Sequence, residues 1–195
     1  MSPDELGVWR NAERKRLIDA RMSMPLEEHA AASEAITQHL GDRFPAASLP
    51  SLGCYWPFRR EFNCMPLMQR IIDRGGWVAL PVVLQKNHPL EFRRWTPETK
   101  MEAGVWKILH PAEGEPVHPT ALLIPLVGFD TAGYRLGYGA GYYDRTLSVF
   151  PHKPLTIGVG FELSRMPTIH PQPHDVPIDY IVTEAGIVHT AAALH

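Results

Sequence analysis

The chain has 195 residues, of which 45% are apolar and 21% are charged, and its formal net charge at pH 7 is −2. This balance excludes a disordered, fibrous or membrane-embedded chain and favours a single domain over residues 1–195. A weakly acidic chain has no overall attraction to nucleic acid or to an anionic membrane, so we expect neither as a partner. We expect a monomer, because no amphipathic stripe is left obviously unburied.

The sequence contains no candidate targeting or membrane segment. Its first 20 residues are too charged for a signal peptide. Its longest apolar stretches fall short of the roughly 20 residues that span a bilayer. We therefore expect a cytoplasmic protein. The two cysteines, Cys54 and Cys64, have no zinc-site spacing and are expected to be buried thiols.

Two helices are predicted at the N-terminus. Ser2, Pro3 and Glu5 form the pattern of a capping box with proline in the first turn, which predicts a helix to about Met22. A second helix is predicted from about 25 to 40, where Gly41 is expected to end it.

Three arginines share one face of the first predicted helix. At 100° per residue, Arg10, Arg14 and Arg21 lie within about 40° of one another around the helix axis. Such a stripe can bind phosphates, whereas composition alone favours a solvent-facing surface.

Short apolar runs then alternate with helical patterns. Strands are predicted at residues 52–56, 77–84, 90–95, 121–127, 155–161 and 178–183, and a helix at 65–74. This alternation predicts an α/β fold, a three-layer Rossmann-like sandwich in which helices flank a mainly parallel sheet, with a helical pair at the N-terminus.

The most informative segment is IPLVGFDTAGYRLGYGAGYYDRTL at 124–147. It begins as a buried strand, passes through Gly133, Gly137, Gly139 and Gly141, and ends as a helical pattern. A strand, a glycine-rich turn and a helix together direct backbone N–H groups at an anion, usually phosphate. The glycine spacing matches neither the Walker loop nor the dinucleotide fingerprint.

Charged side chains flank these glycines. Arg135 can donate two parallel hydrogen bonds to a phosphate, and Asp144 beside it can hold Mg²⁺. A glycine-rich turn capped by Asp144, with Arg145 paired on the surface, explains the same residues equally well. Asp175 precedes the last predicted strand and is expected near the same strand ends. The histidines match no zinc pattern.

Longer motifs carry a family resemblance. RLGYGAGYYDR at 135–145, with IPLVGFD before it, GVGFELSRMPTIHPQPHDVPIDYIVTE after it and LPVVLQKNHPLEFRRW at 80–95, resembles the 5-formyltetrahydrofolate cyclo-ligase family, also called methenyltetrahydrofolate synthetases. The resemblance implies an enzyme that uses ATP and Mg²⁺ to convert 5-formyltetrahydrofolate into 5,10-methenyltetrahydrofolate, ADP and phosphate. It implies a phosphorylated formyl (imidate) intermediate and no covalent enzyme nucleophile.

The resemblance also implies roles for individual residues. The expected catalytic residues are Arg135, Tyr142 and Asp144. The expected ATP contacts are Arg10, Arg14, Arg135, Leu136, Gly137, Gly139, Gly141 and Tyr143. The expected folate contacts are Trp56, Glu61, Tyr138, Gly139, Ala140, Gly141 and Tyr142. The expected Mg²⁺ ligands are Asp144 and Asp175.

The chain departs from the family pattern in the glycine loop, on the first helix and after Phe161, where Glu162 stands in place of the usual glutamine. Relatives often carry a lysine or arginine in the middle of the glycine loop, where this chain has Ala140. The resemblance implies two cations on the first helix, in the spacing Lys-x3-Arg. This spacing can be aligned with Arg10 and Arg14, which keeps both cations, or with Asn11 and Lys15, which keeps one, so we expect Arg10 and Arg14 to supply the missing charge.

Two alternative functions stay open: another ATP-dependent small-molecule ligase or kinase, and a non-catalytic regulator that binds a nucleotide or folate.

Overall fold

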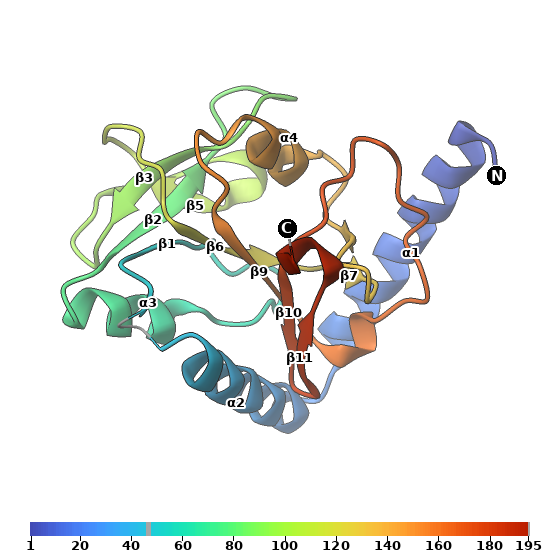
Figure 1. Cartoon of the computed structure of the whole chain (residues 1–195), viewed down its shortest axis with the longest axis horizontal. Helices are drawn as coiled ribbons and strands as arrows, with labels where there is room; N and C mark the ends of the chain where they lie inside the picture. Colours follow the sequence, from blue (N-terminus) through green and yellow to red (C-terminus); the bar gives the residue numbers. More distant parts are fainter. Residues whose placement is uncertain (46–47, 195) are drawn as a thin grey trace.

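The computed structural model describes residues 1–45 and 48–194, and a seven-stranded sheet runs through its centre (Figure 1). In spatial order the strands are β11 (Gly186–His189), β10 (Tyr180–Thr183), β9 (Leu155–Val159), β6 (Ala121–Pro125), β1 (Ser51–Gly53), β2 (Trp77–Val82) and β3 (Glu91–Trp95). The strands from β10 to β2 are parallel, and the edge strands β3 and β11 are antiparallel to their neighbours. The prediction of a mainly parallel sheet is confirmed.

Helices cover both faces of this sheet. They are α1 (Pro3–Ser23), α2 (Leu26–Arg43), α3 (Met65–Asp73) and α4 (Tyr142–Val149). α2 and α3 pack on one face and α4 on the other, which gives the three layers of the expected sandwich (Figure 1). α1 packs against β7 (Gly128–Phe129) and the 3-10 turn Glu162–Ser164. The two N-terminal helices therefore contact different elements of the fold.

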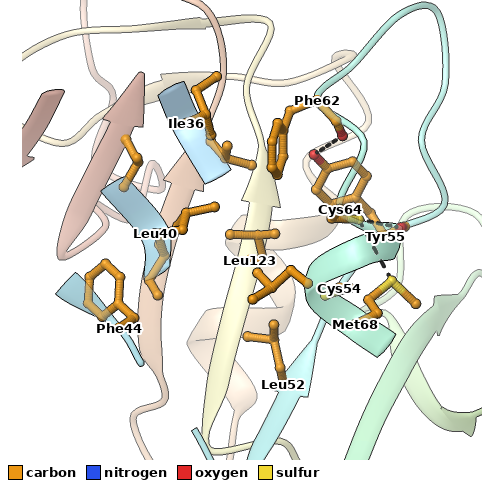
Figure 2. Packing of buried hydrophobic residues seen from close by; sticks show 14 of the residues in the cluster. Ile36, Leu40, Phe44, Leu52, Cys54, Tyr55, Phe62, Cys64, Met68 and Leu123 are labelled. Carbon is orange, nitrogen blue, oxygen red and sulfur yellow. Dashed lines mark hydrogen bonds between the residues drawn. The ribbon is translucent and has the colours of Figure 1, made fainter. Parts of the chain in front are cut away.

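Apolar side chains four residues apart fix α2 on the sheet. Ile36 and Leu40 are buried together with Leu123 of β6 (Figure 2). A four-residue spacing places such side chains on one face of a helix, so this face enters the core. Cys54 and Cys64 lie in the same cluster as free, buried thiols, as expected. None of the helices formed by residues 1–45 and 48–194 has the length and apolar character needed to cross a membrane.

Some predicted boundaries are wrong. α2 continues through Gly41 to Arg43, because buried Leu40 and Phe44 hold its last turn against the core. β1 ends at Gly53, and the chain beyond it leaves the sheet. The sequence analysis also missed β11 and two short hairpins, β4 (Met101–Ala103) with β5 (Leu109–Pro111), and β7 with β8 (Arg135–Leu136). The strands of the two hairpins have two or three residues each and are too short for an alternating pattern to identify.

The solvent-facing interpretation of the arginine stripe on α1 is wrong. Arg21 is only 2% exposed. It donates hydrogen bonds to the backbone oxygens of Arg59 (3.0 Å) and Leu126 (3.2 Å) and to the Tyr138 hydroxyl (2.8 Å). That hydroxyl donates to Glu61 (2.8 Å), whose carboxylate lies 4.0 Å from the Arg21 guanidinium. A buried cation therefore joins α1 to the end of β6 and to two loops.

We expect Arg21→Met to lower the free energy of unfolding by about 3–5 kcal/mol, because it leaves the Glu61 carboxylate buried without a cation. Adding Glu61→Gln should recover part of the loss, since the uncompensated charge is then removed. Urea denaturation measures both effects. The matched control is Arg16→Met, because Arg16 is exposed and pairs with Glu13 on the same helix, and it should change stability by about 0.5 kcal/mol or less. Equal losses in the Arg21 and Arg16 variants would contradict the network.

Candidate functional site

A cleft of about 760 Å³ opens where the parallel strands end. Its wall includes Trp56, Val83 and Pro125, which lie at or just beyond the carboxyl ends of β1, β2 and β6. Other parts of the wall come from α1, the glycine loop, α4 and the segments 105–110 and 173–176. Ligands in open α/β sheets bind at this edge, and the volume suits a small molecule or a cofactor.

The glycine loop, residues 137–141, connects β8 to the N-terminus of α4. Gly139 and Gly141 have φ values of +98° and +63°, which side chains other than glycine adopt only with strain. Gly141 is the residue that precedes α4. Among the described residues, no acceptor is found for the backbone N–H groups of residues 138–141. These groups and the helix N-terminus are available to an anion.

The two candidate metal carboxylates lie in the same cleft, each held by an arginine. Asp144 Oδ1 accepts hydrogen bonds from Arg135 Nη2 (2.9 Å) and from the Val176 N–H (3.1 Å). Asp175 Oδ2 accepts from Arg10 Nη2 (2.6 Å) and from the Gln172 N–H (2.7 Å). Burial by itself acts to raise the pKa of Asp175, but these hydrogen bonds outweigh it, and the pKa is lowered. The carboxylate is therefore ionised at neutral pH.

These carboxylates fit a magnesium ion that draws its other ligands from elsewhere. Mg²⁺ is held by one or two carboxylates together with phosphate oxygens and water. No donor among the described residues occupies Asp144 Oδ2, whereas Arg10 engages both oxygens of Asp175. Residues 1–45 and 48–194 contain no group of three or more His, Cys, Asp or Glu side chains that could hold a metal alone. Of the two carboxylates, Asp144 therefore has the oxygen more accessible to a metal ion.

The other part of the cleft is aromatic and contains one buried carboxylate. Glu61 is 6% exposed and accepts from the Phe58 N–H (2.9 Å) and from Tyr138 (2.8 Å). Burial raises the pKa of Glu61, and the charge of Arg21 together with these hydrogen bonds opposes that rise only in part. Half-buried Trp56 lines the same wall. A carboxylate among aromatic rings suits a flat heterocycle with adjacent N–H donors.

The sequence analysis missed Trp106. Its ring lies 5.7 Å from that of Tyr138, and half of its surface is exposed at the cleft. Trp106 and Lys107 have φ values of 53° and 61°, a strained conformation that often marks a binding segment. The only signal in the sequence is an apolar pair, Val105-Trp106, in a connection between strands.

The structure brings most of the predicted site residues to one cleft. Those in its wall are Arg10, Arg14, Trp56, Glu61, Arg135, Gly137, Tyr138, Gly139, Ala140, Gly141, Tyr142, Tyr143, Asp144 and Asp175. Leu136 is the exception, since its side chain is buried in a cluster with Leu17 of α1. Arg10 and Arg14 both reach the cleft from α1, whereas Lys15 is exposed and pairs with Asp19.

Comparisons with known proteins agree on one family. The model of the 5-formyltetrahydrofolate cyclo-ligase family matches residues 7–184. The 5-formyltetrahydrofolate cyclo-ligase of Haemophilus influenzae is 30% identical over 160 residues, which cover 78% of this chain and 85% of the relative. The mouse enzyme of that name is 36% identical over 187 residues, covering 88% and 91%.

A solved structure supports the same assignment. The NMR structure of Aquifex aeolicus 5,10-methenyltetrahydrofolate synthetase superposes with a TM-score of 0.80 at 28% identity and covers 93% of both chains. The residues matched by the family model include the glycine loop and the whole lining of the cleft, and the chain therefore belongs to the 5-formyltetrahydrofolate cyclo-ligase family.

Proposed function

We propose that this protein catalyses the ATP-dependent cyclisation of 5-formyltetrahydrofolate to 5,10-methenyltetrahydrofolate, releasing ADP and phosphate. The observation that supports the proposal is that one cleft is lined on one side by the glycine loop and arginines and on the other by a buried carboxylate among aromatic rings. A glycine loop with arginines suits the phosphates of ATP, and a buried carboxylate among aromatic rings suits a pterin. We expect the enzyme to act as a monomer in the cytoplasm.

The folate is proposed to bind along the aromatic wall. The Glu61 carboxylate can accept two adjacent N–H groups of the pterin, and Trp56 provides an apolar surface for its ring. Tyr138 already donates to Glu61, which fixes the carboxylate before the folate arrives. The segment 139–142 lies between this wall and the phosphate side, where the formyl group must meet ATP.

ATP is proposed to bind at the glycine loop. The backbone of Leu136, Gly137, Gly139 and Gly141 and the side chains of Arg10, Arg14, Arg135 and Tyr143 are the proposed contacts. Among them, Arg135 is 8% exposed and fixed by the Val176 carbonyl (2.6 Å) and by Asp144 (2.9 Å). A cation held in advance stabilises a transferring phosphoryl group with little reorganisation. Mg²⁺, held by Asp144 with Asp175 as second carboxylate, would neutralise phosphate charge when bound.

The proposed reaction needs positioning more than covalent catalysis. The formyl oxygen attacks the γ-phosphorus of ATP, ADP leaves, and the formyl group becomes a phosphorylated imidate. N10 then attacks the activated carbon and the ring closes; N10 gives up its proton, which the departing phosphate can accept, and the carbon–oxygen bond breaks to release phosphate. Phosphorylation is required because an amide oxygen by itself is a poor leaving group. Arg135 and Asp144 are proposed to act at the phosphoryl group and Tyr142 beside the formyl group.

The direct test is a spectroscopic assay with the purified protein, 5-formyltetrahydrofolate and MgATP. We expect a near-ultraviolet absorbance from the conjugated methenyl product that requires all three components. ATP consumption that another small substrate stimulates, without this absorbance, would indicate a different ligase or kinase. Binding of both ligands without turnover would indicate a regulator, and either outcome contradicts the proposal.

We expect Asp144→Asn to lower kcat/KM for MgATP by about 100-fold or more, because the amide retains an acceptor for Arg135 but loses the charge that holds Mg²⁺. Asp175→Asn should have a milder effect, since Arg10 already engages that carboxylate. Steady-state rates across a Mg²⁺ titration measure both. Asp19→Asn is the control, because Asp19 is exposed and pairs with Lys15 on the surface of α1. Near-normal rates of both variants at limiting Mg²⁺ would rule out the metal assignment.

Glu61→Gln should raise KM for the folate about tenfold or more and leave KM for ATP nearly unchanged, because a charged acceptor of two N–H groups is lost. The pKa of Glu61 is raised by burial, so acid protonates it earlier than an exposed carboxyl. Wild-type KM for the folate should therefore rise as the pH falls through this pKa, and the variant should lose that dependence. Equal effects on both substrates would place Glu61 outside the folate site.

A further inference from the structure

Four arginines line the cleft, and they differ in whether a carboxylate neutralises them. Arg10 pairs with Asp175 (2.6 Å) and Arg135 with Asp144 (2.9 Å). Within residues 1–45 and 48–194, no carboxylate oxygen lies within 4.0 Å of the Arg14 or Arg145 guanidinium. Two cations of the cleft wall therefore have no acidic partner in the described part of the chain.

Arg145 lies where a positive charge is locally unfavourable. It is in the first turn of α4, and its Nη1 donates back to the Ala140 carbonyl. A Cβ on Gly141 would lie 3.1 Å from that same Nη1, so the guanidinium lies against the loop. The N-terminus of a helix carries a partial positive charge, which disfavours a cation and favours an anion. An anion bound here would neutralise both the helix end and Arg145.

Arg14 contacts the same loop at its first residue, Gly137. Its Nε donates to the Gly137 carbonyl (2.9 Å), and a Cβ on Gly139 would lie 3.4 Å from its guanidinium carbon. Two guanidinium groups therefore lie against one short segment. Each engages a single loop carbonyl, which leaves further N–H donors on Arg145 without an acceptor among the described residues.

We propose that Arg145 is a phosphate-binding residue of the glycine loop, which contacts the β- and γ-phosphates of ATP opposite Arg14. The inference rests on the proposed function and goes beyond it, because the expected ATP contacts did not include Arg145. Arg145 supplies a charge that the small side chain of Ala140 does not. A planar guanidinium is suited to the role, since it donates two parallel hydrogen bonds to phosphate oxygens.

The test distinguishes the effect of the Arg145 charge from the effect of its hydrogen bond to the loop. Arg145→Gln removes the charge and retains an amide that can donate to the Ala140 carbonyl. Isothermal titration should show MgATP dissociation constants about 10- to 100-fold higher for this variant, and AMP, which lacks the β- and γ-phosphates, should change less than about threefold. The MgATP dissociation constant of Arg145→Lys should lie between those of wild type and Arg145→Gln, because lysine keeps the charge but cannot donate two parallel hydrogen bonds from a planar group. Arg16→Gln, on the exposed face of α1, is the control and should match wild type.

A second variant distinguishes phosphate binding from a purely structural role. Adding Ala140→Lys to Arg145→Gln places an ammonium group beside the lost guanidinium and should recover at least a third of the lost MgATP binding free energy. A lysine side chain at position 140 cannot replace the hydrogen bond that Arg145 donates to the backbone carbonyl of residue 140. If Arg145 only stabilises the loop, MgATP binding should therefore not recover. Unchanged MgATP affinity in Arg145→Gln, or equal losses for MgATP and AMP without recovery, would overturn the inference.

The methenyl product assay distinguishes the two proposals. If wild type and Arg145→Gln form product with the same KM for MgATP, the role of Arg145 is wrong and the proposed function stands. If the wild-type protein binds no MgATP, both are wrong.

Discussion

The buried guanidinium of Arg21 connects the segments from which the cleft is built. It reaches the loop after β1 through the Arg59 carbonyl, the end of β6 through the Leu126 carbonyl, and the glycine loop through the Tyr138 hydroxyl. Its positive charge also opposes the cost of burying Glu61. The glycine loop and the aromatic side of the cleft therefore share one anchor.

The other arginines of the cleft wall are buried or half-buried. A buried or half-buried arginine needs an acceptor, and Asp144 and Asp175 provide charged ones for Arg135 and Arg10. These pairs fix the orientation of each side chain before any substrate is bound, which lowers the entropy lost on binding. The same pairs mean that a phosphate competes with a carboxylate for Arg10 and Arg135, whereas Arg14 and Arg145 offer charge without that competition.

The topology of the sheet explains why these groups meet. β1, β2 and β6 are neighbouring parallel strands, so the segments that follow them leave the sheet at the same edge. α4 lies on the face opposite α2 and α3, which brings its N-terminus and the glycine loop over that edge (Figure 1). α1 then closes the side of the cleft and contributes two arginines, one helical turn apart.

The sequence by itself determined the features that depend on neighbours along the chain. The capping box at Ser2 and Glu5, the alternation of apolar runs with helical patterns, and the strand, glycine turn and α4 at 124–149 all follow from local spacing. The motif at 135–145 also indicated the family. Only the tertiary structure decided that Arg21 is buried, that Arg10 pairs with Asp175 across 165 positions, and that Arg145 lies in the cleft wall without an acidic partner among the described residues. Periodicity shows which residues share a face of one element, but the burial and charge of a side chain depend on distant segments that fold against it.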